Sequence, residues 1–430
     1  MRVAVIGGGY AGLAAAVTLA AHGAPVTVFE AARDLGGRAR GVAMGGLRLD
    51  NGQHLLLGAY HETLRLLRQV HGDAPLPLQR LPLRLCFPGH FDLAAPRLPS
   101  PLHLGAALAT AKGLGFAESG GAIRFIGQLR KMRFHLRQDI SVEALLRRHG
   151  QGGAAARYLW RPLCLAALNT PPAAASAQLF LNVLRDTLFA RREASDLLLP
   201  QTDLTALFPR PAADFIRRHG GLIHTGQRVR AATLSPEGGF QLTTATERRH
   251  FSHVVCATPP QHLAALAREL PLLRETAEQV AAFRYQPCYT VYLQYPAAVA
   301  LPAPFIGLTD GWTQWLFDRG NSHHQTGLLA AVISGEGMHQ AVTHDELARR
   351  VHDEVNRVLG GGLPPPQWQR VIGEQRATFA CTVALRRPSP VTPLKRWLLA
   401  GDYTAGDYPA TLEAAVQSGV SCARLVLATA

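Results

Sequence analysis

Lysine is almost missing from this chain, since only three of its 44 basic residues are lysines and the rest are arginines. The formal net charge is +14, but a bias this strong toward arginine is typical of genome composition. No sequence motif of a nucleic-acid-binding domain accompanies the charge, so we expect no nucleic-acid partner. The three lysines are Lys112, Lys131 and Lys395.

Cysteine and long apolar runs are equally scarce. The six cysteines are scattered without any C-x-x-C spacing, which argues against a disulfide scaffold and against a zinc site. We expect reduced, buried thiols, no bound metal and a cytoplasmic location. No run of 18 uncharged apolar residues occurs, so no transmembrane helix is expected. At 430 residues, 47% of them hydrophobic, the chain is long enough for about two domains.

The first thirty residues are typical of a dinucleotide-binding βαβ unit. An apolar strand over residues 2–7 is followed by the glycine pattern G-x-G-x-x-G at residues 7–12. An alanine-rich helix over residues 11–22 comes next, and a second strand over residues 26–29 leads into Glu30. Strand, glycines, helix and acid are all parts of this unit. Together they predict a nucleotide site far more strongly than the glycine pattern alone.

Each residue type in this unit has a physical task. Gly7 permits the tight turn, Gly9 lets the backbone approach a pyrophosphate, and Gly12 lets the helix pack on the strand. The helix that begins near Ala11 offers free N–H groups and a partial positive charge to the phosphates. The carboxylate of Glu30 is placed to bind a ribose hydroxyl and to repel a 2′-phosphate. The site therefore suits FAD or NAD better than NADP.

A second glycine-rich element follows directly and distinguishes between these cofactors. Residues 35–40 read L-G-G-R-A-R, and residues 50–54 read D-N-G-Q-H. This combination resembles the flavin-containing amine oxidase and phytoene desaturase superfamily. The resemblance implies an FAD site in which Gly37 and Arg38 lie beside the pyrophosphate. An arginine can form two charge-assisted hydrogen bonds to one phosphate group, which a lysine cannot.

The C-terminal region agrees with this resemblance. A strand that begins at residue 396 ends in Gly401-Asp402, and a helix from Leu412 to about residue 427 follows Thr411. The resemblance implies that Asp402 lies near the ribityl or pyrophosphate groups of FAD. It also implies that the amides near Thr411 and Leu412 face the pyrimidine edge of the flavin. A helix N-terminus there would stabilise the negative charge of a reduced flavin.

A third segment belongs to the same cofactor site. Residues 220–229 predict turn, strand, turn and strand, and the resemblance implies that Val229 contacts the adenine through its backbone. A short buried strand over residues 253–257 returns the chain to the sheet. We therefore predict an α/β protein with a Rossmann-like FAD-binding domain of the amine oxidase type, assembled from discontinuous segments, plus an α+β substrate-binding domain with a helical cap. The FAD-binding domain comprises residues 1–60, 205–265 and 392–430, and the substrate-binding domain comprises residues 61–204 and 266–391.

The middle of the chain narrows the resemblance to one branch. Residues 159–171 read L-W-R-P-L-C-L-A-A-L-N-T-P, a long apolar segment that ends in a polar turn. Together with D-N-G-Q-H at residues 50–54 and P-A-T-L-E-A-A at residues 409–415, this segment resembles the hydroxysqualene dehydroxylases. That family is also described as squalene-associated FAD-dependent desaturases. The match extends over essentially the whole chain.

The resemblance implies reductive removal of the hydroxyl group of hydroxysqualene, which gives squalene and water in hopanoid and isoprenoid biosynthesis. The hydroxyl is allylic, so its departure as water leaves a delocalised cation that hydride from N5 of reduced FAD would quench. The protein must supply a proton, exclude water and hold a C30 chain. The apolar residues 159–168 and 179–189 either line such a slot or are simply core helices. Residues 150–155 match G-x-G-x-x-A but follow a helical run and not a strand, so no second dinucleotide domain is expected and the electron donor is external.

Two other functions remain open. A phytoene-type carotenoid desaturase or an amine oxidase would use the same fold. Amine oxidases of the superfamily often place a lysine near flavin N5, and this chain has none from residue 132 to residue 394. A non-enzymatic lipid carrier, or a membrane-bound assembly partner of prenyl synthases, is the other alternative. The intact cofactor motifs weigh against it.

The proton donor is the least determined part of the site. His54 is our first candidate, because an unperturbed imidazole suits proton donation near neutrality. Asp407, Tyr403 and Asp50 are rivals, and a carboxylic acid would have to be buried to stay protonated. Bound water is a further source of the proton to consider.

Residues 122–137 predict a basic amphipathic helix, with apolar residues at helical spacing and basic residues on other faces. Such a helix can lie on an anionic membrane surface, or it can simply pack on its own domain. The first outcome would place a peripheral protein at the inner face of the cytoplasmic membrane. The apolar positions are Ala122, Phe125, Ile126, Leu129, Met132 and Leu136, and the basic ones are Arg124, Arg130, Lys131, Arg133 and Arg137.

Overall fold

A five-stranded parallel sheet joins segments from the whole length of the chain in the computed structural model, which describes residues 1–429. The strand order is β10-β2-β1-β14-β20. All strands except β10 are buried along their whole length, as is usual for a parallel sheet covered by helices. This arrangement confirms the predicted α/β, Rossmann-like architecture. The strands are β1 (Val3–Ile6), β2 (Val26–Phe29), β10 (Leu222–His224), β14 (His253–Cys256) and β20 (Trp397–Leu399).

Helices from both ends of the chain pack together on this sheet. Helices α1 and α15 approach so closely that a Cβ atom on Gly419 would lie 2.0 Å from the carbonyl oxygen of Ala11. Their apolar side chains share one buried cluster with those of α2, α10 and the sheet. Helix α2 begins just after residue 60, the predicted end of the first cofactor segment, and its core contacts are nevertheless with this cluster. The helices are α1 (Tyr10–Ala21), α2 (His61–His71), α10 (Pro209–Arg218) and α15 (Leu412–Leu427).

A three-stranded antiparallel sheet follows β10. The predicted second strand at the end of residues 220–229 is wrong, because residues 227–230 are irregular and the next strand begins at Ala231. The N–H of Gln227 donates to the carbonyl oxygen of Glu30 at 2.8 Å, which turns the chain past the end of β2 before pairing resumes. The strands are β11 (Ala231–Leu234), β12 (Phe240–Thr243) and β13 (Arg248–Phe251), followed by α11 (Leu263–Ala267) and α12 (Arg274–Ala281).

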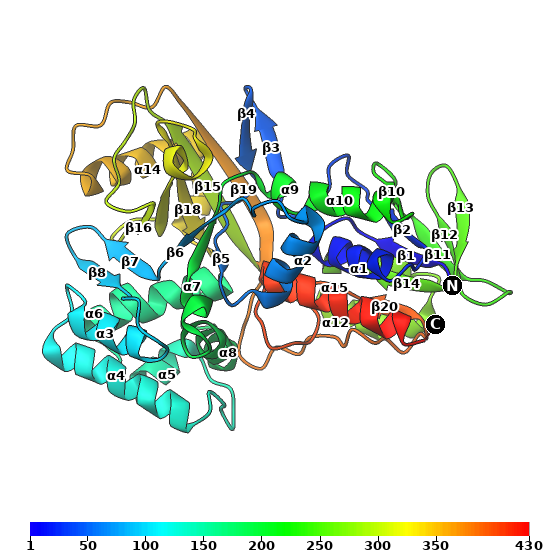
Figure 1. The fold of residues 1–430 in the computed structure, drawn as a ribbon, viewed down its shortest axis with the longest axis horizontal. Coiled ribbons are helices and arrows are strands. Elements are labelled where there is room, and N and C mark those ends of the chain that lie inside the picture. The colour runs from blue at the N-terminus through cyan, green and yellow to red at the C-terminus, as the bar shows by residue number, and fades with distance from the viewer. Residues whose placement is uncertain (430) are drawn as a thin grey trace.

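The second half of the molecule is built on an antiparallel sheet with the order β16-β17-β18-β15-β19. Helix α14 packs on one face of it through a shared apolar cluster. Figure 1 shows the parallel sheet at the right, close to both termini, and this antiparallel sheet with α14 at the upper left. The elements are β15 (Tyr285–Gln294), β16 (Phe305–Gly307), β17 (Trp315–Asp318), β18 (Leu328–Ser334), β19 (Trp368–Phe379) and α14 (His344–Val358).

A group of helices occupies the lower left of Figure 1. Residues 150–155 lie after a helix, as predicted; residues 150–152 form a loop, and residues 153–155 form the short α6. A single turn of π-helix (Ala156–Trp160) joins α6 to α7. The helices are α3 (Leu102–Thr110), α4 (Phe116–Lys131), α5 (Val142–Arg148), α6 (Gly153–Ala155), α7 (Arg161–Leu168) and α8 (Ala177–Leu188).

The predicted helix over residues 122–137 is wrong at both ends. Helix α4 begins at Phe116, where Glu118 caps it by accepting the N–H of Gly115 at 3.2 Å. It ends at Lys131, and the chain turns through Arg133 and Phe134, both with positive φ. The inner face of α4 is buried in its own domain, with Ala122, Phe125 and Leu129 in the core.

Short pieces complete the fold. Among the described residues, no helix is both long and apolar enough to span a bilayer. The remaining strands are β3 (Gly41–Met44), β4 (Leu47–Asp50), β5 (Leu56–Leu57), β6 (Leu78–Leu81), β7 (Arg84–Phe87), β8 (Phe91–Ala94) and β9 (Leu197–Pro200), and the remaining helices are α9 (Leu204–Leu207) and α13 (Arg319–His323).

Candidate active site

The glycine turn between β1 and α1 fits a pyrophosphate. Gly7 has a φ of +113°, and a Cβ atom on Gly12 would lie 1.9 Å from the carbonyl oxygen of Gly7. Both positions therefore need glycine for the packing of the protein itself. Gly9 differs, because a Cβ atom there would meet no protein atom closer than 3.9 Å. Glycine at this position leaves room for the close approach of a bound group at the N-terminus of α1, where an anion is favoured.

Free backbone groups line the two places where the cofactor is expected to touch main chain. Within residues 1–429, the N–H groups of Ala11 and Gly12 have no hydrogen-bonding partner. The same is true of both the N–H and the C=O of Val229, whose side chain is buried. Buried or half-buried backbone groups rarely stay unpaired, so these positions fit a bound phosphate and a bound adenine.

The carboxylate of Glu30 closes the glycine turn from the end of β2. Its Oε2 atom accepts a hydrogen bond from the N–H of Gly8 at 2.6 Å, and its Oε1 atom accepts one from the N–H of Ala32 at 2.7 Å. Each oxygen keeps a further lone pair. Glu30 is half-buried and can also accept a hydrogen bond from a ribose hydroxyl.

The second glycine element lies beside the first. Gly36 forms a bridge to Gly9, and Gly36 and Gly37 have φ values of +113° and +61°. This turn places Arg38 beside Asp402, in the C-terminal part of the site. Arg38 Nη2 donates to Asp402 Oδ1 at 2.6 Å, and Arg38 Nη1 donates to the carbonyl oxygen of Ala377 in β19 at 2.7 Å.

This ion pair holds the Arg38 guanidinium at the meeting point of three segments. Burial alone would lower the pKa of Arg38, but Asp402, together with Glu374 and Tyr285, more than offsets this, so the pKa lies above its ordinary value. The Arg38 side chain is still 35% exposed. It therefore keeps donor capacity for an anionic group such as a phosphate.

The C-terminal helix begins as predicted. Thr411 is the N-cap of α15, and its Oγ1 atom accepts a hydrogen bond from the N–H of Ala414 at 3.2 Å. Gly401, with a φ of +158°, donates its N–H to Ser418 Oγ at 2.7 Å. The N–H of Leu412 has no partner within residues 1–429. The start of α15 can thus face the flavin edge with free donors.

Glu413 has a role that sequence reasoning missed. Its carboxylate is fully buried and accepts hydrogen bonds from the N–H groups of Glu62 (3.0 Å) and Thr63 (2.9 Å) and from the Thr63 hydroxyl (2.6 Å). It therefore caps α2 and joins this helix to α15. No local pattern could have shown this, because the partners lie about 350 positions earlier in the chain.

His54 lies close enough to Arg38 for the arginine charge to act on it. Its Nδ1 atom lies 2.6 Å from the carbonyl oxygen of Gly52, which can only accept, so Nδ1 carries the proton. Burial, and then the charge of Arg38, hold the pKa of His54 below its ordinary value. Neutral His54 therefore offers Nε2 as a hydrogen-bond acceptor.

Asp50 is held in a buried ion pair. Its Oδ2 atom lies 3.2 Å from Nη1 of the fully buried Arg319, and its Oδ1 atom accepts the N–H of Leu204 at 2.8 Å. Burial raises the pKa of Asp50 to about 6, although both partners lower it. Arg319 also donates to Gln53 Oε1 at 3.0 Å, so the pair fixes the loop that carries His54. Sequence reasoning missed Arg319.

The other two proton-donor candidates lie in opposite surroundings. The hydroxyl of Tyr403 is buried and has no hydrogen-bonding partner in the described part of the chain. Burial raises the pKa of Tyr403 well above its ordinary value. The side chain of Asp407 is 74% exposed and lies 3.7 Å from Arg185. The structure therefore does not bring Asp407 together with His54 in a buried site.

The apolar middle segment reaches the cofactor site at its end. Asn169, in the left-handed region with a φ of 44°, ends α7. Its Nδ2 atom donates to the carbonyl oxygen of Pro287 at 3.2 Å and to Thr378 Oγ1 at 3.0 Å. Thr378 follows Ala377, which binds Arg38. The predicted lining segments form α7 and α8, and much of both is core. The partly buried apolar side chains of α7, of α8 and of the residue that follows α8 are Leu163, Ala167, Leu179 and Phe189.

Tyr285 is a further residue that the sequence did not point to. It begins β15 and lies close enough to Arg38 and Asp402 for both charges to act on it. Burial raises the pKa of Tyr285, so its hydroxyl keeps its proton at neutral pH and can donate a hydrogen bond. Arg376 lies over its ring at 5.6 Å from the centroid.

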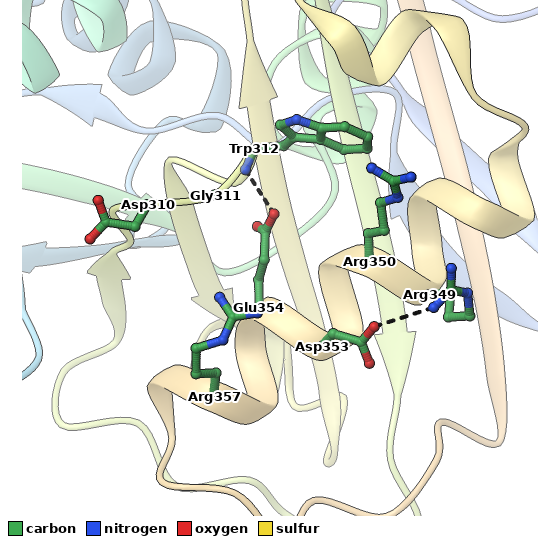
Figure 2. Close-up of a pocket in the computed structure, with 8 residues that line it drawn as sticks. All are labelled: Asp310, Gly311, Trp312, Arg349, Arg350, Asp353, Glu354 and Arg357. Carbon is green, nitrogen blue, oxygen red and sulfur yellow. Dashed lines mark hydrogen bonds and ion pairs between the residues drawn. The ribbon is translucent and has the colours of Figure 1, made fainter.

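A surface cleft of about 450 Å³ beside α14 is separate from these residues (Figure 2). Glu354 accepts a hydrogen bond from the N–H of Trp312 at 2.7 Å, and Arg350 lies over the Trp312 ring at 4.7 Å. Arg349 lies 3.5 Å from Asp353. The charged side chains of the cleft are mostly engaged with neighbouring protein groups, and no predicted cofactor or catalytic residue lines it. In the described residues, no group of three or more His, Cys, Asp or Glu side chains could hold a metal ion.

Comparison with known families gives a consistent result. The family model for flavin-containing amine oxidoreductases matches residues 10–427. A hydroxysqualene dehydroxylase from Rhodopseudomonas palustris is 32% identical over 440 residues, covering 99% of this chain and 98% of the relative. One from Sinorhizobium fredii is 29% identical, with 99% and 98% covered. A probable zeta-carotene desaturase from Synechococcus elongatus is more distant, at 24% identity with 99% and 98% covered.

Solved structures share the fold. An oxidoreductase from Methanosarcina mazei has a TM-score of 0.76 at 14% identity, with 98% of this chain and 99% of the other covered. A putrescine oxidase variant has a TM-score of 0.73 at 16% identity, with 100% and 99% covered. At such low identity these similarities show the fold alone.

Proposed function

The chain belongs to the flavin-containing amine oxidoreductases and, among them, to the hydroxysqualene dehydroxylases, and from this premise we propose that it reductively removes the hydroxyl group of hydroxysqualene to give squalene and water. FAD is its cofactor. One observation carries the proposal. Arg38 binds Asp402 on one side and the carbonyl oxygen of Ala377 on the other. The cofactor site that we propose, assembled from both ends of the chain, would therefore open against β19, in the predicted substrate-binding domain.

The residues that would hold FAD are those predicted from the sequence. The backbone of Gly7, Gly9, Ala11 and Gly12 would bind the pyrophosphate, and Glu30 the ribose. Gly37 and Arg38 would face the phosphates from the other side. The remaining contacts would come from Val229 at the adenine and from Gly401, Asp402, Thr411 and Leu412 at the ribityl and flavin end.

Reduced FAD, when bound, supplies the hydride. The balance of the reaction is then simple: the C–O bond breaks, the hydroxyl leaves with one added proton as water, and the hydride forms the new C–H bond. The protein has to deliver the proton, keep bulk water away from the allylic cation and hold the chain in place. Partly buried apolar side chains of α7 and α8, such as Leu163 and Leu179, are our candidates to hold the isoprenoid.

We propose that His54 acts on the substrate hydroxyl. Neutral His54 accepts a hydrogen bond at Nε2 while Nδ1 stays bound to Gly52, which orients the hydroxyl. The protonated form donates at Nε2 and delivers the proton. Tyr403 and Asp407 remain weaker proposals. Tyr403 holds its proton strongly, and the carboxylate of Asp407 faces solvent.

The wider setting of the reaction is also a proposal. We expect a C30 isoprenoid as substrate, an external electron donor, and a cytoplasmic protein that contacts the inner face of the cytoplasmic membrane. Squalene and its hydroxylated precursor partition into lipid, so a protein that binds them gains from lying at a bilayer surface.

One anaerobic assay tests the proposed function. Protein loaded with FAD is reduced with dithionite and mixed with hydroxysqualene, and squalene is measured by mass spectrometry while the flavin absorbance is followed. We expect squalene to form as the flavin is reoxidised. The oxidised protein is mixed with phytoene in parallel. Desaturated products there, without squalene from the first mixture, would favour the carotenoid desaturase alternative. A purified protein that takes up no FAD would overturn both.

A further inference from the structure

The outer face of α4 carries apolar side chains that nothing covers. Phe116 is fully exposed, and Ile123, seven residues later on the same face, is 41% exposed. The opposite face of this helix packs Phe125 and Leu129 into the core. A helix on the surface of a globular protein normally has one apolar face, turned inward, and a polar outer face. Helix α4 also carries two large apolar side chains on its exposed side.

Two more exposed apolar side chains lie at the start of the neighbouring helix and just before it. Leu102, the first residue of α3, is 63% exposed, and Leu98 in the preceding loop is 40% exposed. Helices α3 and α4 are in contact. Figure 1 shows them at the lower-left edge of the molecule, at the end opposite both termini. We call the face formed by Leu98, Leu102, Phe116 and Ile123 the outer α3–α4 face.

The segment that carries these side chains is rich in positive charge, although Asp92, just before it, lies beside Lys112. Residues 93–138 contain seven lysines or arginines and a single acidic residue, Glu118. That carboxylate is already engaged, because it accepts the N–H of Ala154 at 2.7 Å and that of Gly115 at 3.2 Å. The exposed basic side chains are Arg97, Lys112, Arg124, Arg130, Lys131, Arg133 and Arg137.

The basic side chains are placed beside the apolar ones. Arg130 continues the line of Phe116 and Ile123 along α4 at a spacing of seven residues, which returns to the same side of a helix. Arg124 and Lys131 flank that line. Gly120 and Gly127 lie one turn after Phe116 and Ile123. Neither glycine places a polar side chain between the members of this line. Exposed aromatic and aliphatic side chains beside lysines and arginines are typical of a helix that lies in a lipid interface.

We propose that the outer α3–α4 face docks on an anionic bilayer, with Phe116, Ile123 and Leu102 in the interfacial region and the arginines and lysines on the lipid headgroups. The proposal rests on the proposed function in one respect, since an isoprenoid substrate gives the docking its purpose. The positive charge of this face favours an anionic bilayer over a second copy of the chain as its partner. A cationic apolar face complements negatively charged headgroups and opposes docking on a second copy of itself.

Vesicle binding tests the proposal without any turnover. The FAD-loaded protein is co-sedimented with vesicles of phosphatidylcholine alone and of equal parts phosphatidylcholine and phosphatidylglycerol. We expect binding to the anionic vesicles that falls as salt is added. Phe116→Ser should weaken that binding about tenfold. Arg124→Ala combined with Lys131→Ala should weaken it by a similar factor.

Matched variants elsewhere keep the result specific. Met338→Ser removes a side chain that is 73% exposed, and Arg248→Ala removes an exposed arginine; both should bind the vesicles as the parent does. Wild-type protein that ignores anionic vesicles would overturn the proposal, as would equal binding by Phe116→Ser. A dimer in light scattering that Phe116→Ser abolishes would assign the face to a second copy instead.

The readouts separate this proposal from the proposed function. Turnover of detergent-dispersed hydroxysqualene should be the same in Phe116→Ser and in the parent, because Phe116 is not part of the cofactor site. Loss of vesicle binding with intact detergent activity supports the docking face. Vesicle binding by a protein without dehydroxylase activity would support the docking face and contradict the proposed function.

Discussion

Arg38 and Asp402 form an ion pair of 2.6 Å across 364 positions of sequence. The pair joins the second glycine turn, near the start of the chain, to the strand end that precedes α15. The carboxylate of Asp402 is nearly buried, while the guanidinium of Arg38 is partly exposed. The acid therefore serves as an anchor, and the arginine keeps donors free for the cofactor. This geometry gives Asp402 an indirect task that its position in the sequence did not reveal.

Asp402→Asn should weaken FAD binding without unfolding the protein. Asparagine has the same size but removes the charge that orients Arg38, and a hydrogen bond to a charged group contributes about 2 kcal/mol. We expect the Kd of FAD, measured by flavin fluorescence titration, to rise roughly 30-fold. Asp407→Asn is the control, because that carboxylate is exposed and should leave the Kd unchanged. Equal affinity in both variants would contradict the anchoring role of Asp402.

Gly9 and Gly12 should respond differently to alanine. A Cβ atom on Gly12 would overlap the carbonyl oxygen of Gly7, so Gly12→Ala should lower the melting temperature of the FAD-free protein. A Cβ atom on Gly9 meets no protein atom within 3.9 Å and the residue has an ordinary φ of −80°. Gly9→Ala should therefore fold normally and lose FAD. Thermal unfolding and flavin absorbance measure the two effects. A stable Gly9→Ala protein that keeps full FAD affinity would show that nothing approaches this backbone.

The local parts of the cofactor site could be predicted from the sequence because each is specified by neighbouring residues. The glycine turn needs only Gly7 and Gly12, and the C-terminal helix begins at Leu412 as expected because Thr411 caps it. The spacing of the motifs also predicted the parallel sheet. Such features depend on propensity and capping within a few residues.

The rest depends on contacts that no local pattern contains. Arg319 and Asp50 are 269 positions apart, and no sequence pattern around either residue indicates that they form an ion pair. The end of α4 was misplaced because apolar spacing continues to Leu136, while the backbone turns at Arg133 and Phe134. The buried side of α4 follows the apolar spacing read from the sequence, but the exposed Phe116 lies before the segment that the pattern selected.

His54→Ala should block turnover while FAD stays bound. A positioned general acid contributes about 10²–10⁴-fold, so we expect kcat to fall by at least about 100-fold with an unchanged flavin spectrum. In the parent, burial holds the pKa of His54 below its ordinary value, and only the protonated ring can donate at Nε2. The rate should therefore rise as the pH falls toward that lowered pKa.

The pH profile separates His54 from its alternatives. His54→Gln should keep the substrate hydrogen bond but lose the acid limb of the profile. Undiminished turnover in His54→Ala, or a parent rate that is flat across the acidic range, would remove His54 from the mechanism and favour bound water or Tyr403 as the proton source.

The buried pair of Asp50 and Arg319 should make stability depend on pH. Burial raises the pKa of Asp50 to about 6 in the folded chain from an ordinary value of 3.8. The folded chain thus holds a proton that the unfolded chain has lost, and the contribution of this group to stability falls as the pH rises through that range. The charge of Arg319 limits the effect, because it lowers the pKa that burial raises.

Arg319→Met tests how much the charge of Arg319 offsets the burial of Asp50. The variant leaves a buried, unpaired carboxylate at pH 7, and we expect the free energy of unfolding to fall by about 3–5 kcal/mol. The deficit should shrink at pH 5, where Asp50 takes up a proton and becomes neutral. Urea unfolding at the two pH values measures it, with Arg349→Met, which breaks an exposed pair with Glu346, as the control that changes little at either pH. Adding Asp50→Asn to Arg319→Met should recover much of the loss at pH 7. An equal deficit at both pH values would mean that Arg319 stabilises the fold through packing and not through the charge of Asp50.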